Sequence, residues 1–565
     1  MAIRGAAPED VAGARTAAWA VFLTLLAVFT ATMCGLPDNT DSECEFQTTS
    51  ALVRTGSLAL GGTPEGDAMA ANPGLAPIRI GTDGRAYSWF GIGQAGLAVP
   101  LYLVGRTVGH LAPAIEERHA QTIYYGYPRS EYFEHLLVGW RNPLLSALTA
   151  WMLVLVVREL GASARASYFC GLSYGLASFA WAQARSTLSD VQATFFVFAA
   201  FALLLLLRRR QLLGAARSRL ALLAFGAALG LAFLTRSLTA PALVVLGIGS
   251  IAVGAGAKRL HGWRAVLVDA FWVAVPAAAC IAIFLWTNVA RFGDPLESGY
   301  GEPLSTGLFF SHPLHLGFAG LLLSPGKGLL WTAPLVLLAP FGVRAAWRRG
   351  RRLFPWLLAG ILAAVFLPVA KMAGWHGAWT YGPRYVLPAL PFLWAAAWLA
   401  YDRAGTGMRF AFLALTALGV VTSLPAALVD QQTHQELAMS AARLERDPAG
   451  VPDASLPPAV REEQLFQKIQ WDWRFAAPWA HWRILRHRVA GDEERFSAAE
   501  LFFLDEDAPL AVSHDRQRGF LHLAWVDLSK RLDGPGWVGW LLSLALLAAG
   551  VGVALTRREI LAPAS

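Results

Sequence analysis

Residues 16–46 read TAAWAVFLTLLAVFTATMCGLPDNTDSECEF, an apolar run followed at once by a polar segment that is rich in acids. Residues 16–36 are long and apolar enough to cross the hydrocarbon core of a bilayer, which takes about 20 residues. The run is too long, and its end too acidic, for a cleaved signal peptide. The sequence therefore predicts a first membrane span with Asp41 just beyond it, outside the cytoplasm.

The rest of the chain shares this apolar character. Of its 565 residues 55% are hydrophobic and only 15% are charged, and the mean hydropathy is +0.44. Soluble proteins carry about 25% charged residues, so the predicted fold class is an α-helical polytopic membrane protein. The net charge of +8 does not indicate a nucleic-acid partner, because the arginines cluster in short loops between apolar runs.

Twelve apolar stretches are predicted to be transmembrane helices. They are residues 16–36, 136–157, 166–183, 191–207, 220–235, 238–256, 265–287, 328–346, 353–370, 386–401, 410–428 and 536–555. The short loops between them are alternately rich and poor in arginine. By the positive-inside rule both termini lie in the cytoplasm, and the protein belongs in the cytoplasmic (inner) membrane.

This orientation leaves large polar segments outside, of which the first, 37–135, holds Asp41. The apolar stretch 90–108 within it is rich in glycine, and counting it as a span would invert every loop downstream. It is therefore predicted to lie on, or dip into, the outer interface. The predicted units are a transmembrane domain 1–428, an extracytoplasmic domain 429–535, and a final helix with a cytoplasmic tail, 536–565.

Eight short motifs follow one another over residues 40–393. They are TDSECEFQTTSALVRTGSLAL (40–60), GRAYSWFGIGQAGLAVPLYLVG (84–105), WRNPLLSALTAWMLVLVVRELG (140–161), ARSTLSDVQATFF (184–196), LGLAFLTRSLTAPAL (229–243), RFGDPLESGY (291–300), LLLSPGKGLLWTAP (321–334) and WTYGPRYVLPALPFL (379–393). In this order they resemble bacterial membrane glycosyltransferases of the C superfamily, in the group of the protein O-mannosyltransferases and aminoarabinose transferases (glycosyltransferase family 39). Residues 429–535 resemble no family.

Members of that family transfer a sugar from a polyprenyl-phosphate carrier to an acceptor on the outer face of the membrane, with an acid of the first outer loop as base. The resemblance implies that Asp41 is this base and that Asp190 matches a second acid found in the relatives. Direct displacement would invert the anomeric carbon. Asp38, Glu43 and Glu45 are the alternatives to Asp41, and residues 40–43 also read as a helix cap.

Several cationic and aromatic side chains are candidates for holding the carrier phosphate. They are Arg384, Tyr381, Arg236, Arg141, Lys327 and His376. The planar fork of an arginine suits a phosphate, although arginine and aromatic side chains at the interface are equally typical of membrane anchors. Asp41 and Asp190 could together bind a divalent metal through oxygen ligands, and no other cofactor is predicted.

The predicted partners are a polyprenyl-phosphate sugar donor, membrane lipids, and a glycan, lipid or protein as acceptor. One alternative is a transporter or flippase of a lipid-linked saccharide, which would show charged or broken helices at the bilayer midplane and repeated halves. Another is a non-catalytic assembly protein of the cell envelope, which would tolerate the loss of Asp41. The sequence has no Walker loop for a nucleotide, and it does not identify the sugar.

Overall fold

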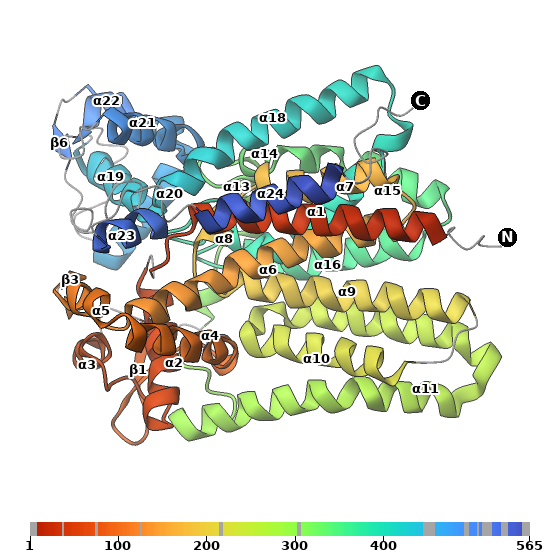
Figure 1. Ribbon diagram of the computed structural model, residues 1–565, viewed down its shortest axis with the longest axis horizontal. Helices are drawn as coiled ribbons and strands as arrows, with labels where there is room; N and C mark the ends of the chain where they lie inside the picture. The colour runs from red at the N-terminus through yellow and green to blue at the C-terminus, as the bar shows by residue number, and fades with distance from the viewer. Residues whose placement is uncertain are drawn as a thin grey trace.

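The computed structural model is a bundle of long helices with short helices and hairpins gathered at one end (Figure 1). It describes residues 8–36, 39–73, 77–121, 123–124, 127–213, 218–301, 307–444, 458–490, 496–505, 508–510, 523–532 and 541–555. The helices that form the bundle are α1 (Pro8–Thr32), α6 (Tyr132–Glu159), α7 (Ala164–Leu176), α8 (Ala180–Arg185), α9 (Asp190–Leu212), α10 (Arg219–Thr235), α11 (Ala240–Phe292), α13 (Leu314–Leu323), α16 (Leu353–Lys371), α18 (Thr406–Leu428) and α24 (Leu541–Leu555).

Seven segments of the described chain are long and apolar enough to cross a membrane. They are Gly13–Thr32, Tyr132–Glu159, Asp190–Leu212, Ser237–Gly254, Gly262–Phe292, Leu353–Lys371 and Thr406–Leu428. The fourth and fifth lie in α11, whose backbone leaves the helical conformation at Gly262, and shorter apolar helices include α10, α13 and most of α24. The predicted fold class, an α-helical polytopic membrane protein, is confirmed.

Three of the predicted spans consist of consecutive short helices. Residues 166–183 fall in α7 and α8. Residues 328–346 form α14 (Leu329–Thr332), η4 (Pro334–Leu338) and α15 (Ala339–Arg348), and residues 386–401 form η5 (Arg384–Ala389), α17 (Leu390–Trp398) and the start of η6 (Tyr401–Arg403). A proline lacks the N–H that continues a helix and clashes with the preceding turn, which explains the break at Pro334.

The segment that follows α1 builds one part of the end of the bundle. It contains α2 (Thr40–Thr55), α3 (Pro64–Ala71), β1 (Ile78–Ile80) paired with β2 (Ala86–Ser88), α4 (Ile92–Leu111), α5 (Pro113–Ala120) and the strands β3 (Ile123–Tyr124) and β4 (Tyr127–Pro128). Asn39 caps α2, because its side chain accepts a hydrogen bond of 2.9 Å from the backbone N–H of Ser42. Helix α4 packs against α2 and α6 and lies at this end of the bundle (Figure 1). That residues 90–108 lie on, or dip into, the outer interface stays a prediction.

The segment after α18 lies at the same end (Figure 1). It contains α19 (Gln431–Leu444), α20 (Pro458–Trp471), η7 (Trp473–Phe475), α21 (Ala477–Ala490), β5 (Phe496–Ser497), α22 (Ala498–Phe502), β6 (Pro509–Leu510) and α23 (Ala524–Arg531). It has an apolar core of its own, which includes Leu437, Ile469 and Phe475. The side of the membrane that this end faces stays a prediction.

The first and last helices are joined along their length. Helix α24 packs against α1. At the start of α23, the backbone N–H of Ala524 donates a hydrogen bond of 3.0 Å to the carbonyl oxygen of Met33. The remaining short helices are η2 (Ser237–Thr239) and η3 (Leu308–Phe310). Met33, after the end of α1, and Ala524, at the start of α23, thus meet near the end of the bundle that carries Asp41.

Candidate active site

Two residues predicted from distant motifs meet at this end of the bundle. Asp41 lies in the first turn of α2, and Arg384 begins η5. The Oδ2 atom of Asp41 is 3.6 Å from Nη2 of Arg384, and the side chain of Asp41 is 34% exposed while that of Arg384 is 9% exposed. The acid is therefore accessible to a substrate, and the guanidinium is held by the protein.

A second acid and arginine lie beside the first pair. Asp190 begins α9 and Arg236 follows α10, and Oδ1 of Asp190 is 3.1 Å from Nη1 of Arg236. Arg236 also donates a hydrogen bond of 3.2 Å to Oγ of Ser189. Asp190 is fully buried, and it lies in the first turn of α9, at the end of the helix where the backbone N–H groups point outward.

Tyr385 connects the two arginines. Its ring centroid is 4.7 Å from Cζ of Arg236 and 4.8 Å from Cζ of Arg384, within the range of cation–π contact. Its hydroxyl oxygen accepts a hydrogen bond of 3.0 Å from Nη2 of Arg384. Tyr385 is not among the residues predicted for the site, and its one signal in the sequence is its place directly after Arg384.

The electrostatic surroundings keep Arg384 charged. Burial alone would lower the pKa of this guanidinium, but Tyr385, Asp190 and Asp41 outweigh that effect and raise the pKa above its ordinary value. A buried guanidinium that keeps its charge has several donors in a fixed plane. Such a group can hold a phosphate oxygen where water is scarce.

Glu45, one helical turn after Asp41, is a further acid of this cluster. It is buried, and burial raises its pKa well above the ordinary value, with a further contribution from Asp41. Arg141 and Arg236 oppose this shift. Within the described chain its Oε2 atom has no hydrogen-bond partner. Glu45 therefore favours the protonated form, whereas its neighbour Asp41 faces an arginine and the solvent.

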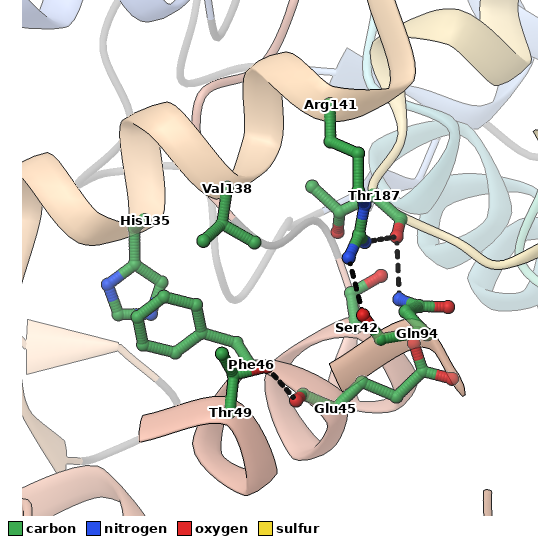
Figure 2. A pocket seen from close by; sticks show the side chains of 9 residues that line it. All are labelled: Ser42, Glu45, Phe46, Thr49, Gln94, His135, Val138, Arg141 and Thr187. Atoms are coloured by element: carbon green, nitrogen blue, oxygen red, sulfur yellow. Dashed lines mark hydrogen bonds between the residues drawn. The ribbon is translucent and has the colours of Figure 1, made fainter. Parts of the chain in front are cut away.

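A small cavity separates Glu45 from the helix that carries Arg141 (Figure 2). Its volume is about 10 Å³, which is the size that holds one water molecule. Arg141 donates hydrogen bonds of 2.9 Å to the carbonyl oxygen of Gln94 and of 3.3 Å to that of Thr187. These bonds tie α6 to α4 and to the segment before α9, so Arg141 holds the walls of the site together.

Lys327, His376 and Tyr381 lie on or against the loop that leads to Arg384. Nζ of Lys327 donates hydrogen bonds to the carbonyl oxygens of Ala378, at 2.8 Å, and of Thr380. Burial and the nearby Arg384 lower the pKa of Lys327 well below its ordinary value. The hydroxyl of Tyr381 donates a hydrogen bond of 2.8 Å to the carbonyl oxygen of Thr422. These contacts fix the loop, and the structure shows none of the three side chains in contact with Asp41.

The alternatives to Asp41 as base are placed as follows. Asp38 lies outside the described residues. Glu43 is buried, and its Oε1 atom accepts a hydrogen bond of 2.7 Å from Gln47 and lies 3.3 Å from Nε2 of His135. Burial would raise the pKa of Glu43, but His135 outweighs burial and lowers it. Glu43 is therefore engaged in an internal pair, away from Arg384.

Among the described residues, nothing in the structure adds to the prediction of a metal site at Asp41 and Asp190. Asp41 and Asp190 each face a guanidinium, and the described residues contain no group of three or more His, Cys, Asp or Glu side chains that could hold a metal ion. A divalent ion would have to compete with the two arginines for the carboxylate oxygens. Metal binding by Asp41 and Asp190 stays a prediction.

His376 links this loop to α20. Its Nδ1 atom accepts a hydrogen bond of 3.0 Å from the N–H of Ala378, so the proton of the neutral ring is on Nε2, which is 3.1 Å from Oε1 of Glu463. Burial lowers the pKa of His376 despite Glu463. For Glu463 the bond from His376 outweighs the raising effect of burial, and its pKa is also lowered.

We expect the protein to lose stability in acid, because the buried His376 resists taking up a proton. His376 and Glu463 both have folded-state pKa values below their ordinary values of 6.5 and 4.5, so the unfolded chain binds protons first and the free energy of unfolding falls as the pH drops below about 6.5. The melting temperature at pH 7 and pH 5 measures this loss. His376→Gln should reduce the difference, and the exposed His110→Gln should leave it unchanged. An equal difference in His376→Gln and the wild type would contradict the expectation.

Comparisons with known proteins give likenesses among solved structures. No family model and no curated protein matches this chain. ArnT from Cupriavidus metallidurans in the apo state is 16% identical with a TM-score of 0.42, over 94% of this chain and 78% of that chain. The same protein bound to undecaprenyl phosphate gives a TM-score of 0.39 at 16% identity, over 99% and 82% of the two chains. The oligosaccharyltransferase AglB from Archaeoglobus fulgidus, in complex with an inhibitory peptide and a dolichol-phosphate, is 14% identical with a TM-score of 0.41, over 78% of this chain and 58% of that chain.

Proposed function

We propose that this protein is a membrane glycosyltransferase that moves a sugar from a polyprenyl-phosphate carrier to an acceptor hydroxyl. The observation that carries the proposal is the pair of Asp41 and Arg384, an accessible carboxylate beside a buried guanidinium. A positioned carboxylate can take the proton of an attacking hydroxyl. A fixed cation beside it can stabilise the charge that develops on a leaving phosphate. The motif order described above supports the same assignment.

The reaction follows from these two roles. The acceptor oxygen attacks the anomeric carbon while its proton passes to Asp41, and the bond between that carbon and the phosphate oxygen breaks. The phosphate leaves with the bonding electron pair and is stabilised by Arg384. Arg236, whose charge is shared with Asp190 at 3.1 Å, adds positive potential on the other side of Tyr385. A single displacement of this kind inverts the configuration of the sugar.

We place this site on the outer face of the cytoplasmic membrane, with both termini in the cytoplasm. In support, the short elements of 40–128 and of 431–531 gather at one end of the bundle (Figure 1). The arginine run that ends α9 and Arg158 in the last turn of α6 lie at the opposite end, as the positive-inside rule requires of the cytoplasmic side. The proposed units remain 1–428, 429–535 and 536–565. The second unit contacts the loop that leads to Arg384 through the pair of Glu463 and His376, and we propose that it helps to bind the acceptor.

Sealed vesicles that contain the full chain test this proposal against a flippase. We expect radiolabelled sugar to move from a polyprenyl-phosphate donor to an added acceptor fraction, with no transfer from a nucleotide sugar. A labelled lipid-linked sugar that crosses the bilayer without any transfer would instead establish the transporter. If no panel of polyprenyl-phosphate sugars supports transfer while the protein remains folded, the enzyme assignment is wrong.

A further inference from the structure

A groove of about 1010 Å³ opens at the end of the bundle opposite Asp41. Its walls are the first half of α1 and the last part of α9, and both helices pack against α6, which forms its floor. Along α6, Arg141 and Glu159 are 18 residues apart, or about 27 Å at the rise of an α-helix. The groove is thus separate from the site of Asp41 and Arg384, and it faces the other leaflet of the membrane.

The inside of the groove is apolar. Trp19, Trp151, Leu155 and Leu206 line it, and the rings of Trp19 and Trp151 lie 5.9 Å apart. Trp19 is 48% and Leu206 is 43% exposed, so the described protein leaves part of this surface uncovered. In a bilayer such a surface contacts hydrocarbon chains, and tryptophan is typical of the level at which chains meet headgroups.

The rim of the groove is strongly cationic. Arg15, Arg158, Arg209 and Arg351 line it together with one acid, Glu159. Arg209 is engaged by Glu159 at 3.1 Å, and Arg158 donates a hydrogen bond of 2.7 Å to the carbonyl oxygen of Ala162. The side chains of Arg15 and Arg351 make no ion pair or hydrogen bond with the described part of the chain. Two guanidiniums therefore remain at the rim for an anion outside the protein.

We propose that this groove binds an anionic phospholipid of the leaflet on the arginine-rich side. Arg15 and Arg351 hold the headgroup, and the acyl chains lie along Trp19, Trp151 and Leu155. Basic pockets between membrane helices recognise anionic headgroups through such pairs. The carrier of the transferred sugar is a different ligand, because its phosphate must reach Arg384 at the far end of α6. This inference does not depend on the proposed transferase activity.

Native mass spectrometry of the full chain tests the proposal, with phosphatidylglycerol and phosphatidylcholine added in equal amounts to protein in a mild detergent. We expect the wild type to retain more phosphatidylglycerol than phosphatidylcholine. Each arginine near the membrane surface changes the affinity for an anionic lipid about fivefold, so Arg15→Gln with Arg351→Gln should weaken it roughly 25-fold. The control is Arg264→Gln with Arg348→Gln, which removes the same charge from exposed positions that do not line the groove.

A second variant fills the groove and keeps its charges. Leu206→Trp should displace phosphatidylglycerol although all four arginines remain, and thermal unfolding in the same detergent checks that each variant is folded. Equal retention of the two lipids by the wild type would overturn the proposal. So would equal losses of phosphatidylglycerol in the rim variant and its control, or the displacement of phosphatidylglycerol by an equal amount of polyprenyl phosphate.

Discussion

Asp41→Asn is expected to lower the rate of sugar transfer by about 10²–10⁴-fold, which is the usual contribution of a general base. The amide keeps the size of the carboxylate but cannot take a proton from the acceptor hydroxyl. Asp41 is 34% exposed, so the substitution opens no cavity, and Arg384 keeps its hydrogen bond to Tyr385 and the attraction of Asp190. The loss should therefore appear in kcat, with little change in donor binding. Transfer of radiolabelled sugar from a polyprenyl-phosphate donor measures it.

The matched control for this experiment is Asp83→Asn. Asp83 is another acid of the segment after α1, its side chain is 35% exposed, and it is paired with Arg85 at 2.7 Å. We expect the control to transfer sugar at the wild-type rate. Unchanged transfer by Asp41→Asn would exclude Asp41 as the base and would direct the search to Glu45, one helical turn away, or to Asp38.

Arg384→Lys is expected to reduce kcat/KM for the donor by about 10²–10³-fold, similar to the loss of one donor to a developing oxyanion. Lysine keeps a positive charge, but it loses the planar fork and the stacking on Tyr385 at 4.8 Å. A lysine at this depth would also lose charge more readily than arginine, as the lowered pKa of the buried Lys327 indicates. Assays of the purified full chain at several donor concentrations give kcat and KM separately.

The exposed Arg85→Lys is the control for the change of residue type, because the side chain of Arg85 is 59% exposed. It should behave as the wild type. Full activity of Arg384→Lys would mean that the phosphate is held elsewhere, with Arg236 as the next candidate. The double variant Arg236→Lys with Arg384→Lys then decides whether the two arginines, which share Tyr385, act as one unit.

The sequence was sufficient to predict the class of fold, and two of the side chains that it proposed for the site lie side by side in the structure. Ordered motifs pointed to Asp41 and Arg384, which the fold brings to 3.6 Å. The sequence could not decide whether Asp41 or Glu43 is the base, because two acids two residues apart are distinguished only when a helix places them on different sides. In the structure Glu43 faces His135.

Other features depend on packing between distant segments and left no pattern in the sequence. Tyr385 lies between Arg236 and Arg384 because α10 ends beside η5, and no periodicity of either segment predicts that contact. The break in the helix at 328–346 was not predicted, because the stretch is apolar throughout and hydropathy takes no account of the missing N–H of Pro334. The sequence thus indicates which residues belong to the candidate site, whereas the distances between them depend on the tertiary structure.

The packing of α24 along α1 has a consequence for biosynthesis. The first helix enters the membrane roughly 500 residues before its partner is translated, which takes about 25–100 s at ribosomal rates. During that time one side of α1 contacts lipid or an insertion chaperone in place of α24. The hydrogen bond from Ala524 to Met33, a few residues before Asp41, also forms only then. The end of the bundle that carries Asp41 therefore takes its final structure only after α23 and α24 have been translated.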